Sequence, residues 1–210
     1  MLFIFTGVMA AFLVEDYRDS REATQRSELI AGALYQDIAD SHQVMNTFIG
    51  RIDQGLADYA AQVDNGLKPV PFVFEIRGSL KPPPGVWEMA GEVGIRELAD
   101  PGLLFELSFF YSETQGVSEN FVRYVEFTEQ VFWPVALSDT TSFYEPETGL
   151  LRGDFAAHLQ QLRDYRADLV RLVAWAGSLQ EQLQATVPGI VTTAPSSLTE
   201  NRYNESFRVR

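Results

Sequence analysis

The sequence predicts an all-α fold in which three long helices pack as an antiparallel bundle. Apolar residues recur at steps of three and four through three long segments, about 15–65, 102–133 and 154–186, which is the spacing of one helical face. Prolines and glycines gather between these segments, where the chain must turn. Residues 70–76 could form a strand, but the prolines at 69 and 71 disfavour a place in a sheet.

The first segment predicts one continuous helix with three different parts. Residues 1–14 are uncharged and mostly apolar, residues 15–28 are heavily charged, and an apolar stripe follows. The stripe consists of Ile30, Leu34, Ile38, Met45, Phe48, Ile49, Ile52, Leu56, Tyr59 and Val63. Asn65 and Gly66 are typical residues for the end of a helix, so we expect the helix to stop there.

Residues 1–14 are interpreted as a membrane anchor. Its apolar residues are Leu2, Phe3, Ile4, Phe5, Val8, Phe12 and Leu13. About 14 residues rise only about 21 Å, short of a hydrocarbon core of ~30 Å. A short span and a one-sided insertion therefore remain open, beside a cleaved signal peptide and a buried soluble helix. Nothing basic precedes the run, which disfavours the signal peptide.

The middle of the chain predicts an extended connector, a broken helix and a long helix. Residues 67–85 break the helical pattern, and the prolines at 82–84 favour a stiff polyproline spacer over a recognition motif. Residues 86–99 form a short helix interrupted by glycines. Asp100 is a good N-cap with Pro101 at the first helical position. The next helix then runs to Trp133, because Pro134 follows.

The last long segment is predicted to form a helix that packs along its whole length against the other helices of the bundle. A turn-rich link, residues 135–153, precedes Asp154, which can cap the helix. Apolar residues then recur every seven positions at Phe155, Leu162, Leu169, Ala176 and Leu183. This heptad spacing is typical of helices that pack along their length. The helix ends before Val187, and residues 188–210 are predicted to form an extended tail.

Composition and motifs favour a protein without catalytic or cofactor chemistry. The net charge of −13 disfavours nucleic acid as a partner, and the absence of cysteine excludes thiolate chemistry. The spacing of Asp37, Asp40 and His42 lacks a second histidine, so a solvated helix face is expected rather than a metal site. His158 beside the heptad stripe is expected to be packed or half-exposed. No nucleotide-binding or hydrolase motif occurs, and we expect no cofactor and no enzyme.

Two stretches carry a resemblance to a known group of proteins. They are the run from Phe12 to Arg18, where the apolar segment becomes charged, and a Trp87-centred turn followed by the Asp100–Pro101 helix start and Phe110–Tyr111. Over about residues 1–135 the chain resembles uncharacterised bacterial single-span inner-membrane proteins. The resemblance implies an N-terminal anchor helix and a helical domain on the outer, periplasmic side of the inner membrane. The positive-inside rule, applied to the arginines after the anchor, favours the cytoplasm. We give the resemblance more weight than the arginines and expect the bulk of the chain on the periplasmic side.

These observations predict a non-catalytic accessory subunit of a larger inner-membrane complex, with a photosynthetic or respiratory assembly as a possible host. The lipid bilayer and other subunits are the predicted partners. The division is residues 1–14 as anchor, 15–187 as helical domain and 188–210 as tail. The residues expected to contact a partner are Trp133, Tyr203, Phe207, Arg208 and Arg210. A membrane-anchored periplasmic sensor that binds a small ligand is the alternative.

Overall fold

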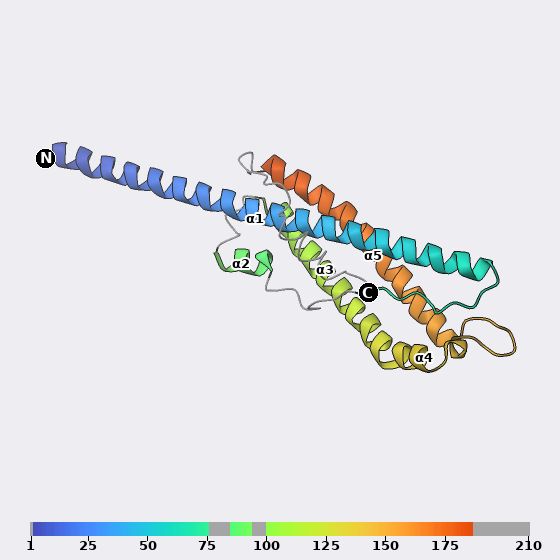
Figure 1. Cartoon of the computed structure of the whole chain (residues 1–210). Coiled ribbons are helices and arrows are strands. Elements are labelled where there is room, and N and C mark those ends of the chain that lie inside the picture. The colour runs from blue at the N-terminus through green and yellow to red at the C-terminus, as the bar shows by residue number, and fades with distance from the viewer. Residues whose placement is uncertain (1, 76–84, 94–99, 187–210) are drawn as a thin grey trace.

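The computed structural model describes residues 2–75, 85–93 and 100–186, and within these ranges the regular structure is entirely helical (Figure 1). This confirms the all-α prediction. The elements in chain order are α1 (Leu2–Asp64), α2 (Val86–Val93), α3 (Pro101–Phe127), the π-helical turn η2 (Thr128–Phe132), α4 (Trp133–Ser138), the 3-10 turn η3 (Thr140–Phe143) and α5 (Gly153–Thr186). Tyr144 and Leu151 form an isolated antiparallel bridge between η3 and α5.

Helix α1 is a single uninterrupted helix of 63 residues. Its first half projects beyond the other helices as an arm, which we define as residues 2–28 (Figure 1). The helix ends where the sequence predicts, because Gly66 adopts a positive φ of 77° that favours glycine. The Gly66 amide donates to the Val63 carbonyl at 2.9 Å and the Leu67 amide donates to the Gln62 carbonyl at 3.1 Å, which is the Schellman pattern.

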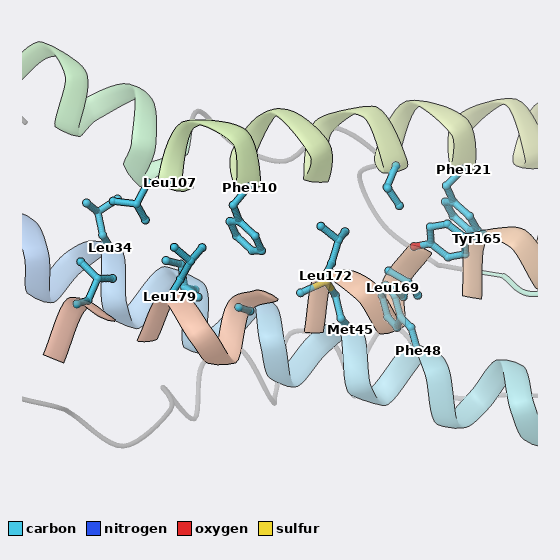
Figure 2. Close-up of a cluster of buried hydrophobic side chains, with 14 of the residues drawn as sticks. Leu34, Met45, Phe48, Leu107, Phe110, Phe121, Tyr165, Leu169, Leu172 and Leu179 are labelled. Atoms are coloured by element: carbon cyan, nitrogen blue, oxygen red, sulfur yellow. The ribbon is translucent and has the colours of Figure 1, made fainter. Parts of the chain in front are cut away.

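Helix α5 packs against both α1 and α3 and runs antiparallel to them, while α1 and α3 run in the same direction (Figure 1). Figure 2 shows the layers that result. Leu34, Leu107 and Leu179 meet in one layer, and Phe48, Phe121 and Tyr165 meet further along the bundle. Each helix supplies a side chain to these layers, so the apolar stripes of all three helices are buried together.

The heptad positions of α5 are buried as predicted. Phe155, Leu162, Leu169, Ala176 and Leu183 all lie in the interior. A fully buried leucine contributes roughly 1.5–3 kcal/mol relative to an exposed one, so these five positions contribute substantially to the stability of the bundle. The stripe of α1 is buried from Ile30 to Ile52, but Val63 at its end is 40% exposed, because the last turn of α1 extends past its neighbours.

The prediction that the second long segment, residues 102–133, ends as a helix at Trp133 is wrong. The chain continues through η2 into α4, and the Trp133 amide donates to the Thr128 carbonyl five residues back. Pro134 therefore falls in the first turn of α4, where its missing N–H group is tolerated. The π-helical turn accommodates the proline by restarting the hydrogen-bond register one residue later.

The described part of the connector after α1, residues 67–75, has no regular secondary structure and carries aromatic side chains into the bundle. Phe74 is buried and lies between Phe48 and Phe121, with ring centroids 5.4 and 6.0 Å away. Its backbone amide donates to the Tyr124 hydroxyl at 2.9 Å. Phe72 lies over Gly55, where even a Cβ atom would approach the ring to 2.1 Å. The predicted polyproline spacer at 82–84 lies outside the described residues.

Of the two predicted helix starts, the one at Asp100 is confirmed and the one at Asp154 is shifted by a residue. The Asp100 carboxylate accepts a hydrogen bond from the Gly102 amide at 2.9 Å, with Pro101 next to it, so the predicted N-cap is confirmed. Helix α5 instead begins at Gly153, which places Asp154 inside the first turn rather than at the cap position. The Asp154 carboxylate there accepts from the Phe155 amide at 3.0 Å and still carries its negative charge near the helix N-terminus.

Candidate functional site

The arm is the first candidate, because it extends away from the bundle. Its neck, residues 15–28, is helical, and Arg21, Glu22, Gln25 and Arg26 are exposed. The predicted anchor residues Leu2, Phe3, Ile4, Phe5, Val8, Phe12 and Leu13 all lie in the first turns of α1. None of the helices in the described ranges combines the length and the apolar run that a membrane crossing needs.

A second candidate is His158, which lies beside the π-helical turn in a cage of aromatic rings. Its imidazole stacks on Tyr124 at a centroid distance of 4.1 Å and lies tilted against Phe127 at 4.7 Å, and the residue is only 3% exposed. The Nε2 atom lies 3.0 Å from the Thr128 hydroxyl, which itself donates to the Tyr124 carbonyl at 2.9 Å. Since that hydroxyl has one proton, Nε2 carries the proton and donates to it.

This arrangement keeps His158 neutral. Burial lowers the pKa of His158 to about 4, and the side chain of Gln161 offsets part of that effect. The Nδ1 atom makes no hydrogen bond within the described residues, so it is a buried lone pair. A lone pair of this kind could act as a base, but the surrounding rings shut it off from solvent. His158 therefore ties α5 to η2, and of the packed and half-exposed positions that the sequence left open the structure has the packed one.

The third candidate joins α1, α2 and α3. The Tyr111 hydroxyl donates to the Asp37 carboxylate at 2.8 Å, and Trp87 stacks on the Tyr111 ring at 5.3 Å. Burial raises the pKa of Asp37, the Tyr111 bond lowers it in part, and the Asp40 charge raises it further. Asp37 is thus half-buried instead of lying on the solvated face that the sequence predicted.

The aspartates and histidine of this α1 segment do not converge on a common point. Asp40 accepts a hydrogen bond from the Gln36 amide at 2.9 Å, and His42 lies beside the Asn46 amide at 3.4 Å. Within the described part of the chain, no group of three His, Asp or Glu side chains is placed to hold a metal ion. Asp37 thus acts as an interhelical acceptor for Tyr111.

Polar contacts at the bundle surface also join helices far apart in sequence. Arg166 of α5 forms a bidentate pair with Asp53 of α1 at 2.8 and 2.9 Å. The Trp175 indole N–H donates to Glu106 at 2.9 Å. Sequence reasoning missed these pairs, because neither member carries a local signal and only the packed helices bring them together.

An exposed aromatic pair lies on the outer side of α3, the side turned away from the core. Phe105 is 67% exposed and Phe109 is 64% exposed. The neighbouring Phe110 is buried, so the aromatic run from Phe109 to Tyr111 lies only partly in the core. Residues 105 and 109 are exposed because they fall between the positions of the buried stripe Leu103, Leu107 and Phe110.

The predicted partner contacts fall in two groups. Trp133 is half-buried and packs edge-on against Phe132 at 5.4 Å, next to a second apolar cluster with Phe143 and Phe155. Tyr203, Phe207, Arg208 and Arg210 lie outside the described residues. The structure therefore leaves part of Trp133 accessible.

Comparison with known proteins gives no relative: no protein family, curated protein or solved structure matches this chain.

Proposed function

We propose that this chain is a non-catalytic accessory subunit of a larger bacterial inner-membrane complex, which holds a three-helix domain at a set distance from the membrane surface. A photosynthetic or respiratory assembly is a suitable host class. The observation that carries the proposal is the continuity of α1. One helix joins the apolar residues 2–14 to the core residues Ile30–Ile52 without a break.

The proposed tether is stiff because of its composition. The neck contains neither glycine nor proline, and oppositely charged residues recur at helical spacing, as in Arg18 with Glu22 and Glu22 with Arg26. Fourteen helical residues extend about 21 Å. A neck with no apolar face gains nothing by lying on lipid, so it stands away from the membrane and sets the height of the bundle.

The apolar segment, residues 2–14, provides the attachment. Its length of about 20 Å exceeds one leaflet of a ~30 Å hydrocarbon core, which fits insertion from one side. It carries three phenylalanines, at 3, 5 and 12. The proposal places the bundle in the periplasm, in line with the proteins that the sequence resembles. Its contacts with partner subunits are the tail residues and the exposed edge of Trp133.

The buried polar groups have a structural role in this proposal. His158 joins α5 to η2, and Asp37 joins α1 to α3. Each of these bonds fixes the position of one helix against another. In a domain that presents a fixed surface to partner subunits, such bonds hold the helices in one arrangement.

Membrane attachment is tested with the full chain and a matched pair of variants. Phe5→Glu combined with Phe12→Glu places two charges in the apolar segment, and Gln25→Glu places one charge in the neck. We expect the double variant to leave the membrane fraction and to stop floating with lipid vesicles, and the neck variant to behave as the parent chain. Flotation of the double variant at the parent level would contradict the anchor.

The subunit role is tested by purification from native membranes in mild detergent. We expect other chains to co-purify, and mass spectrometry identifies them. Deletion of residues 190–210 should abolish co-purification while leaving helicity by circular dichroism nearly unchanged. A chain that runs alone in every mild detergent would overturn the accessory-subunit proposal. Protease accessibility in sealed vesicles then determines the side of the membrane.

A further inference from the structure

We draw no further inference here: the strongest candidate, the exposed aromatic pair Phe105 and Phe109 on the outer side of α3, lies on a helix face for which nothing in the structure shows what covers it.

Discussion

The two ends of the bundle are built differently. At the end from which the arm projects, aliphatic side chains fill the layers, as in the group Leu34, Leu107, Leu179 and Leu183. At the other end, aromatic rings surround His158 and the π-helical turn, as in the group Tyr124, Phe127, Phe132, Phe143 and Phe155. We call the first group the aliphatic layers and the second the aromatic end.

The difference between the two ends follows from the path of the chain at each of them. In the aliphatic layers three straight helices meet, so leucines at regular spacing fill the volume. At the aromatic end the chain turns through η2, α4 and η3, and fewer regular elements are available. Large rings fill the wider space, and polar bonds such as Thr128 to His158 set the position of the helices. Directed bonds occur at both ends, since Tyr111 donates to Asp37 beside the aliphatic layers, but only at the aromatic end does such a bond involve a fully enclosed histidine.

The largest effect is expected in the aliphatic layers. Leu179→Ala removes a fully buried side chain at a layer where three helices meet, so it should lower the free energy of unfolding by about 2–5 kcal/mol. Leu137→Ala in α4 is the control, because Leu137 is 85% exposed and its loss should change stability by less than about 0.5 kcal/mol. Urea unfolding followed by circular dichroism measures both. Equal effects would show that these layers do not carry the stability.

The sequence predicted the aliphatic layers well and the aromatic end poorly. A period of seven identified Leu162, Leu169 and Leu183 as buried, because burial of an apolar stripe depends only on its spacing. The π-helical turn has no comparable signal, since Pro134 normally ends a helix and here begins α4. The Asp37–Tyr111 bond joins residues 74 positions apart, and only the packed helices reveal it.

The aromatic end should respond to pH where the aliphatic layers do not. His158 has a pKa of about 4 in the folded chain and about 6.5 when unfolded. The unfolded chain therefore binds more protons between these values, so the stability is complete above pH 6.5 and falls as the pH drops toward 4. At pH 5 the loss is about 2 kcal/mol relative to pH 7.

This pH effect is isolated by comparison with His158→Gln, which cannot gain a charge. Urea unfolding between pH 7 and pH 4.5 should show a steeper loss for the parent chain than for the variant. Other carboxylates titrate in both chains and cancel in the difference. Parallel pH profiles for the two chains would contradict the assignment of a neutral, buried His158.

The smallest effect distinguishes two glycines of α1, which lie between the two ends. Gly50→Ala places a methyl group in open space and should raise the free energy of unfolding by about 0.5–1 kcal/mol, because alanine is the better helix former. Gly55→Ala places the same group against the Phe72 ring, which must move, so we expect a net loss of about 1 kcal/mol. In a Phe72→Ala background the Gly55 substitution should become stabilising, as the Gly50 substitution is. If the two alanine variants had the same sign in the parent chain, the close packing of the connector on α1 would be refuted.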